Sequence, residues 1–280
     1  MRKSLARYKQ YGECAVLSND VIEIAASLEF GPRILRFGLK DHDNIMFEQP
    51  LDAQYLCTPE GWRVHGGLRL AFAPESEKTY WPDNVPVEYE FLDDGLVLTQ
   101  ACDGFLNARK RIRIGFTDRP DTVDIDFEID NTGNSALVGA PWAITAVRPG
   151  GVLHVPFYNE RLDMFPSRFI SVWGTTGLDD ERLAFEEKEF TVRPLPSDRY
   201  FKIGASCPEG VVRYDVAGQS FIKRFGFDED AVYPDNNVNL EIFCCRAMME
   251  IESLAPLSEI RPGETGLHFE QWSVSRVQIQ

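Results

Sequence analysis

The chain has 280 residues, of which 44% are hydrophobic and 26% charged, so it is neither a disordered tail nor a fibre and can bury a sizeable core. Its 29 Lys and Arg residues are outnumbered by 44 Asp and Glu residues, which gives a net charge of −15. Because like charges repel, this balance argues against nucleic acid or an anionic membrane as a partner.

No stretch approaches the roughly 18 consecutive apolar residues of a membrane span. The polar N-terminal residues 1–14 lack the apolar core of a signal peptide. The six cysteines are scattered without CxxC spacing, which favours reduced, mostly buried thiols over a disulfide framework or a metal site. We therefore expect a cytoplasmic protein.

Apolar and polar residues alternate along most of the chain, which is the pattern of half-buried strands. The strands predicted in the first hundred residues are 14–17, 21–25, 34–39, 87–92 and 96–101. Asp93-Asp94-Gly95, between the last two, is a strong hairpin signal.

A second hairpin is predicted from residues 109–114 and 122–130. Arg109, Arg111 and Arg113 share one face of the first strand, and the acidic residues at 124, 126, 128 and 130 share one face of the second. We expect these rows to face each other across the strands, which accounts for the arginines without a phosphate site.

The second half of the chain continues the same pattern. Further strands are predicted at 136–144, 238–245, 248–254 and 267–274. Arg261-Pro262-Gly263-Glu264 predicts a type II turn, and residues 179–190 are the one plausible helix. No linker or composition break divides the chain, so we expect residues 1–280 to form a single antiparallel all-β domain.

Most motifs of catalytic proteins are absent. The sequence contains no P-loop, GxGxxG, HExxH or GxSxG motif, and its four histidines are isolated. We therefore expect no cofactor and no bound metal.

The segment 62–89 is rich in groups that bind sugars. Aromatic rings stack on the C–H faces of a sugar, and planar carboxylate, amide and guanidinium groups bind paired hydroxyls. The candidates in this segment are Arg69, Glu75, Tyr80, Trp81, Asp83 and Asn84. Trp142 is a further stacking candidate, and Arg33 with Arg69 could orient a carboxylate or phosphate. The same composition also fits an ordered surface loop.

A second candidate site lies near the C-terminus. Glu250 and Glu252 are two residues apart in a strand-like run, so they share one face. Two carboxylates so close tend to raise one pKa, as a general acid or base requires. A solvated strand face is the simpler alternative.

Three segments together resemble motifs of the galactose mutarotase-like superfamily, which includes aldose 1-epimerases and glucose-6-phosphate 1-epimerases. These segments are Phe30-Gly-Pro-Arg-Ile34, Val64-His-Gly-Gly-Leu68 and residues 250–264. Residues 66–75, 79–84, 141–145 and 249–264 resemble those of an uncharacterised aldose-epimerase-like group, so the resemblance spans nearly the whole chain.

The resemblance implies a β-supersandwich of two large antiparallel sheets with few short helices and a sugar-sized groove. In mutarotases a glutamate of the late strand removes the anomeric hydroxyl proton, and a histidine protonates the ring oxygen. Carried onto this chain, the base is Glu252 or Glu250. The central histidines of the family are missing from residues 140–147, which leaves His65, beside Gly66-Gly67, or another group as the acid.

Two functions remain open at this stage. The chain is either an aldose 1-epimerase-like enzyme that interconverts the anomers of a small-molecule sugar, or a non-catalytic carbohydrate-binding protein on the same scaffold. A lyase or another isomerase that acts on a sugar acid is a more distant alternative. The identity of the sugar and the oligomeric state do not follow from the sequence.

Overall fold

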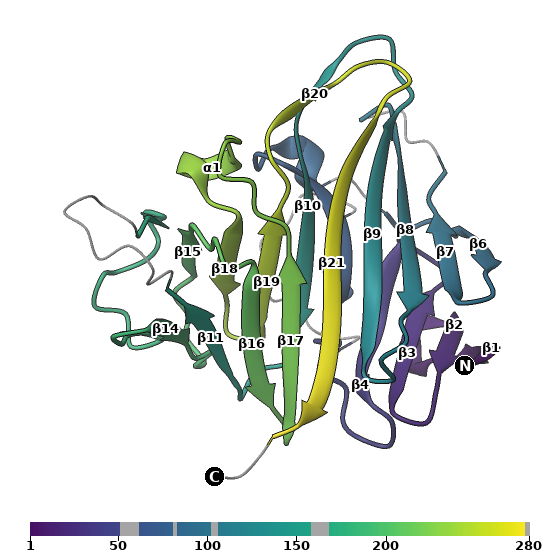
Figure 1. Cartoon of the computed structure of the whole chain (residues 1–280), viewed down its shortest axis with the longest axis horizontal. Coiled ribbons are helices and arrows are strands. Elements are labelled where there is room, and N and C mark those ends of the chain that lie inside the picture. Colours follow the sequence, from purple (N-terminus) through teal and green to yellow (C-terminus); the bar gives the residue numbers. More distant parts are fainter. Residues whose placement is uncertain (51–61, 81–82, 102–105, 158–167, 278–280) are drawn as a thin grey trace.

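The computed structural model describes residues 1–50, 62–80, 83–101, 106–157 and 168–277, which form two large antiparallel sheets. Figure 1 shows the sheets as layers, with β9, β21 and β17 in one layer and β10, β19 and β18 in the other. The predicted all-β sandwich fold is therefore confirmed.

The eleven-stranded sheet runs in the order β1 (Arg2–Arg7), β2 (Glu13–Ser18), β3 (Ile22–Ser27), β4 (Arg33–Leu39), β5 (Gly67–Ala73), β10 (Leu137–Val147), β19 (Met249–Leu254), β18 (Leu240–Cys244), β15 (Phe201–Ala205) and β12 (Ile170–Val172), with β20 (Ser258–Ile260) beside β10. The ten-stranded sheet runs in the order β13 (Leu183–Phe185), β14 (Glu189–Val192), β11 (Val152–Pro156), β16 (Val211–Val216), β17 (Gln219–Phe225), β21 (Thr265–Arg276), β9 (Thr122–Asn131), β8 (Ala108–Phe116), β7 (Gly95–Thr99) and β6 (Glu88–Phe91).

The helical elements of the described residues are short turns: η1 (Lys9–Tyr11), η2 (Glu77–Tyr80) and α1 (Pro234–Asn237). In α1, Asp235 and Asn236 have φ of 49° and 68°, so this turn does not continue as a regular α-helix. None of the helices that the structure describes is long and apolar enough to cross a membrane.

The predicted hairpins form as expected. In the register of β8 and β9, Arg109, Arg111 and Arg113 stand opposite Asp130, Glu128 and Asp126. Each arginine makes an ion pair with a carboxylate of this row, which confirms the cross-strand interpretation.

The predicted turn after β20 is also present, since Gly263 has a φ of 83° and the amide of Glu264 donates to the carbonyl of Arg261 at 2.9 Å.

The helix predicted at residues 179–190 is wrong. This segment contains β13 and β14, which pair as a hairpin with Phe185 opposite Phe190. Leu183 and Phe185 are two residues apart, which is the period of a strand, and no apolar residue continues the three-to-four-residue spacing of a helix. The ring of Phe157 packs on both phenylalanines, at 6.3 and 5.7 Å between centroids, which favours the hairpin.

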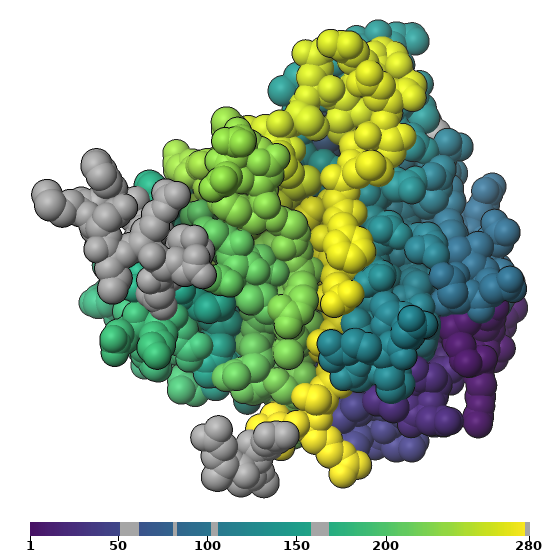
Figure 2. Space-filling model, viewed as in Figure 1, coloured from purple at the N-terminus to yellow at the C-terminus, as the bar shows by residue number. Residues whose placement is uncertain are grey.

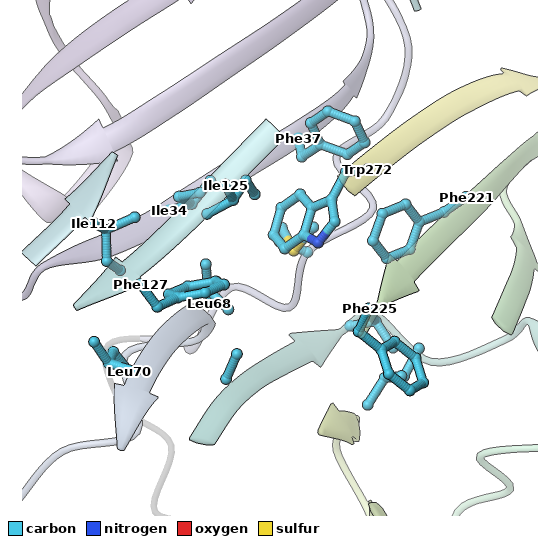
Figure 3. Close-up of a cluster of buried hydrophobic side chains, with 14 of the residues drawn as sticks. Ile34, Phe37, Leu68, Leu70, Ile112, Ile125, Phe127, Phe221, Phe225 and Trp272 are labelled. Atoms are coloured by element: carbon cyan, nitrogen blue, oxygen red, sulfur yellow. The ribbon is translucent and has the colours of Figure 1, made fainter. Parts of the chain in front are cut away.

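The inner faces of the two sheets share one hydrophobic core. Figure 3 shows its central part, where the Trp272 indole of β21 lies between Phe37 of β4 and Phe221 of β17. The Trp272 ring centroid is 5.2 Å from that of Phe37 and 5.3 Å from that of Phe221. Figure 2 shows the other side of this strand, where the yellow C-terminal segment crosses the surface between the green and teal parts of the ten-stranded sheet.

The four cysteines that the structure describes carry free thiols and are buried. Cys244 lies in the main core, whereas Cys245 packs in a separate cluster around Trp62. Adjacent strand residues point to opposite faces, and these two thiols accordingly do not converge. Cys57 and Cys102 lie outside the described residues.

A fully buried ion pair joins the two sheets inside this core. Lys223 Nζ of β17 lies 2.7 Å from a carboxylate oxygen of Glu270 in β21. The same ammonium donates across to the eleven-stranded sheet, at 3.0 Å to Thr145 Oγ1 and at 2.8 Å to the carbonyl of Ile251. Trp272 Nε1 donates to the other oxygen of Glu270 at 2.6 Å. Each charge is therefore satisfied without water.

We predict that Lys223→Met destabilises the fold by about 3–5 kcal/mol, because it leaves the Glu270 carboxylate buried and unpaired. The double variant Lys223→Met/Glu270→Leu should recover much of this loss, since no uncompensated charge remains. Urea unfolding followed by tryptophan fluorescence measures both. Arg119→Met is the matched control, because its side chain is 70% exposed and its loss should stay within about 0.5 kcal/mol. A loss of similar size in Lys223→Met and the control would contradict the prediction.

Candidate functional site

One row of paired residues crosses the outer face of the eleven-stranded sheet. Along β5, β10, β19 and β18 this row consists of Arg69, Ile144, Glu252 and Glu241. Directly paired residues of antiparallel strands point to the same face. Their neighbours Leu68, Ile251 and Ile242 belong to the main core, so the row points away from the ten-stranded sheet.

Lys202 of β15 is the centre of a charge cluster on this face. Its Nζ lies 2.8 Å from the carboxylate of Glu241, 3.5 Å from that of Glu75 and 3.6 Å from that of Glu252. Glu241 is 0% and Glu252 is 1% exposed, whereas the Glu75 side chain is 41% exposed. The ammonium therefore connects two buried carboxyls with one at the surface.

Burial raises the pKa of the carboxyls in this cluster, because their charged form loses its hydration. Burial raises the pKa of Glu252 to about 7. The positive charge of Lys202 lowers this pKa, and repulsion from Glu250 raises it further. The pKa of Glu241 is raised to about 9, by burial and then by repulsion from Glu252. Glu250 also has a raised pKa, mainly from burial. At neutral pH the cluster therefore holds protons on its carboxyls.

Lys202 behaves in the opposite way. Burial alone would lower the pKa of its ammonium, but the surrounding carboxylates outweigh burial and raise this pKa. The ammonium therefore stays charged. Two indole rings lie around it, with Nζ 4.8 Å from the centroid of Trp142 and 5.1 Å from that of Trp173, which are distances of a cation–π interaction.

Gly204 of β15 lets Trp173 approach the sheet. It is the cross-strand partner of Glu241. A Cβ atom at this position would lie 3.3 Å from Cζ3 of Trp173 and 2.7 Å from a methyl carbon of Val238. Val238 and the indole therefore together take the space that a side chain at position 204 would fill.

Five buried polar atoms on this face have no hydrogen-bond partner among the described residues: Arg69 Nε, Trp142 Nε1, Glu252 Oε2 and both carboxyl oxygens of Glu241. They come from the adjacent strands β5, β10, β19 and β18. Buried polar atoms are nearly always paired in folded proteins. The face therefore presents two donors and three carboxyl oxygens without a hydrogen bond, two of which, Oε2 of Glu241 and of Glu252, lie 2.8 and 3.6 Å from the Lys202 ammonium.

The predicted sugar-binding segment packs beside this row. The Arg69 guanidinium lies over the Trp62 ring, 5.0 Å from its centroid, and donates to the carbonyl of Thr79 at 3.3 Å. The Tyr80 ring meets Trp62 edge-on at 5.4 Å between centroids, and its hydroxyl donates to Glu75. Arg69, Glu75 and Tyr80 are thus brought together with Trp142 and Glu252.

Arg33 and Asp83 bind each other. Arg33 is 1% exposed, and its Nε and one terminal nitrogen donate to the two Asp83 oxygens at 2.9 and 3.1 Å. Its other terminal nitrogen donates to the carbonyls of Val64 and Gly66 at 2.8 and 3.3 Å. The guanidinium fork that we considered for a ligand carboxylate or phosphate is therefore used within the protein.

His65 stands at the Arg33 end of the site. Its ring stacks on Phe30 at 3.9 Å between centroids, and its Nε2 is 2.9 Å from Oδ1 of Asn84. Burial and then the charge of Arg33 lower the pKa of His65 to about 4. The imidazole is therefore neutral at pH 7, which is the wrong state for donating a proton to a ring oxygen.

Sequence reasoning missed Lys202, Glu241 and Trp173, and Trp81 lies outside the described residues. A signal for the first two was present, because each is a single charge within an apolar strand, in Phe-Lys-Ile and Leu-Glu-Ile. Among the described residues, no group of three or more His, Cys, Asp or Glu side chains is arranged to hold a metal ion.

The fold is that of the galactose mutarotase-like proteins. A galactose mutarotase-like protein from Lactobacillus casei ATCC 334 superposes with a TM-score of 0.57 at 9% identity, over 94% of this chain and 100% of that one. A second such protein, from Clostridium acetobutylicum, gives a TM-score of 0.54 at 9% identity, over 99% of each chain. These superpositions confirm the predicted resemblance at the level of the fold.

A further similar structure is a TPR-domain containing protein from Parabacteroides distasonis ATCC 8503, with a TM-score of 0.65 at 13% identity. The match covers 96% of this chain but 48% of that one, so this chain spans about half the length of that protein. No family model and no curated protein matches the sequence.

We predict that His65 titrates with a midpoint near pH 4, because protonation would place a second cation beside Arg33 in a largely buried position. Its imidazole signals in an NMR pH titration report this directly, and His65→Asn assigns them by their loss. Since the unfolded chain binds this proton more readily, the contribution of His65 makes the fold less stable as the pH falls from about 6.5 to about 4. A midpoint between 6 and 7 would show that the burial seen around this ring does not persist in solution.

Proposed function

We propose that this chain is an aldose 1-epimerase-like protein that binds a monosaccharide on the outer face around Trp142 and Glu252. The observation that carries the proposal is a set of buried atoms without a hydrogen bond, which includes Arg69 Nε, Trp142 Nε1 and Glu252 Oε2. A sugar hydroxyl both donates and accepts hydrogen bonds, so one ligand can pair such donors and acceptors together. The adjacent indole rings supply the stacking faces that sugar C–H groups require.

Within this site we assign Glu252 as the general base. A base for the anomeric hydroxyl works best when its pKa is close to the operating pH, and the pKa of Glu252 is raised to about 7. Glu250 shares the strand face but lies one pair further along, opposite Phe243 and Ala146. Glu252 is also fully buried beside Lys202, whereas Glu250 is half-buried.

The charge of the site favours an uncharged sugar. Its four carboxyls, Glu75, Glu241, Glu250 and Glu252, accompany two cations, Lys202 and Arg69. Burial is the main cause of their raised pKa values, so this face already disfavours charged groups. The ammonium site between the indoles is occupied by Lys202, and Arg33 is used by Asp83. A phosphate or carboxylate on the sugar would lose its hydration on this buried face, while Lys202 is already held by carboxyls and Arg69 donates to Thr79.

We expect a neutral aldose to bind at least about tenfold more tightly than its phosphate or its uronic acid, which corresponds to about 1.4 kcal/mol for the hydration that the anion loses. Titration against tryptophan fluorescence measures the three affinities, because Trp142 lies in the site. Trp142→Phe keeps a stacking ring but removes the indole donor, so it should weaken binding. Tighter binding of the anionic sugars would overturn the choice of substrate class.

Glu252→Gln should slow the interconversion of anomers by about 10²–10⁴-fold, because the amide cannot take the anomeric proton. Sugar binding should persist, since Gln keeps the shape of the side chain and one acceptor. Polarimetry of freshly dissolved aldoses measures the rate. Glu259→Gln in β20 is the matched control, as its side chain is 59% exposed and lies on a different strand. Equal rates in wild type and Glu252→Gln would remove Glu252 from the proposed reaction.

A non-catalytic carbohydrate-binding protein is the second candidate. It is favoured by the neutral state of His65, because the histidine acid expected from the resemblance is not available in its protonated form. The same polarimetry separates the two functions. A wild-type protein that binds the sugar and leaves the spontaneous rate unchanged is a binding protein.

A further inference from the structure

Glu241 is the direct cross-strand partner of Glu252. Both carboxyls contact the same ammonium, since Lys202 Nζ lies 2.8 Å from Glu241 and 3.6 Å from Glu252. Two carboxyl groups that touch one nitrogen atom can also touch one small group of ligand atoms. The role assigned to Glu252 as the base does not involve Glu241.

Interconversion of anomers needs two proton transfers at neighbouring atoms. The hydroxyl oxygen and the ring oxygen are bonded to the same anomeric carbon, so the base and the acid that serve them must lie side by side. A pair of carboxyls on adjacent strands provides this spacing. His65, by contrast, lies at the other end of the row, stacked on Phe30.

We propose that Glu241 is a second catalytic carboxyl, which acts as the general acid while Glu252 acts as the base; this role rests on the proposed function. Glu252 takes the proton of the anomeric hydroxyl, and the C–O bond to the ring oxygen breaks. The electron pair of that bond goes to the ring oxygen, which takes the proton of Glu241, and the anomeric carbon becomes an aldehyde. After rotation of the aldehyde, ring closure on its other face returns both protons.

The charges around the pair are consistent with one shared proton. The charged groups that face Glu241 are Lys202 of β15, Glu252 of β19 and Asp235 of α1. Those that face Glu252 are Lys202, Glu250 of β19, Arg69 of β5 and Glu75. Burial and mutual repulsion raise both pKa values, to about 7 and about 9. Two interacting carboxyls titrate as a unit, so between these values the pair holds one proton and one negative charge, which is what an acid and a base together require.

The sugar reaches the pair from the side of Glu75. This side chain is exposed, and Lys202 lies between it and the two buried carboxyls. The anomeric end of the sugar therefore lies on the Glu75 side of the Lys202 ammonium in this proposal.

The test is the pH dependence of the anomerisation rate in wild type, Glu241→Gln and Glu241→Asp, by polarimetry. We expect a bell-shaped profile for the wild type, which rises near pH 7 as the base loses its proton and falls near pH 9 as the acid does. Glu241→Gln should lower the rate by about 10²–10⁴-fold and abolish the fall at high pH. Glu241→Asp keeps an acid and should retain a bell-shaped profile at a lower rate.

Circular dichroism and sugar titration of each variant separate loss of catalysis from loss of folding. If Glu241→Gln does not fold, the Asp variant decides, since an unchanged rate there would overturn the role of Glu241. Should Glu241→Gln keep the full rate and profile while Glu252→Gln loses the rate, the role of Glu241 is wrong and the proposed function stands. A wild type without any acceleration overturns the proposed catalysis and this role together.

Discussion

The alternation of side chains along β19 is the constraint on which both the core and the candidate site depend. Ile251 points into the sandwich, and the backbone carbonyl of this residue accepts a hydrogen bond from Lys223 at 2.8 Å, while Glu250 and Glu252 point outward. A slip of the strand by one residue would bring the carboxyls into the core and the apolar side chains out of it. The Lys223–Glu270 pair opposes such a slip, because its ammonium also needs Thr145 of the neighbouring strand.

The alternation of apolar and polar residues correctly predicted which face of a strand each side chain occupies. The alternation in residues 122–130 set the face of every side chain in β9, and the acidic row followed from it. The shared face of Glu250 and Glu252 was predicted for the same reason. The fold class followed from the period of two together with the order of the motifs, and the superposed structures agree with it.

Contacts between distant segments could not be predicted in this way. Lys202 meets Glu75 across 127 residues of sequence, and no local pattern indicates which strands become neighbours. The pairing of Arg33 with Asp83 likewise became visible only once β4 and the segment after η2 lay side by side. The helix predicted at 179–190 was wrong for a related reason, because Phe157, whose ring packs on both phenylalanines of the hairpin, comes from another part of the chain.

Gly204 has a consequence for the position of Trp173. Because position 204 carries no side chain, the Trp173 indole closes the far end of the row against the sheet. Even a methyl group there would press on Trp173 and Val238, and would tilt the indole away from Lys202. The position of the Trp173 indole beside the Lys202 ammonium therefore depends on the absence of a Cβ atom at position 204.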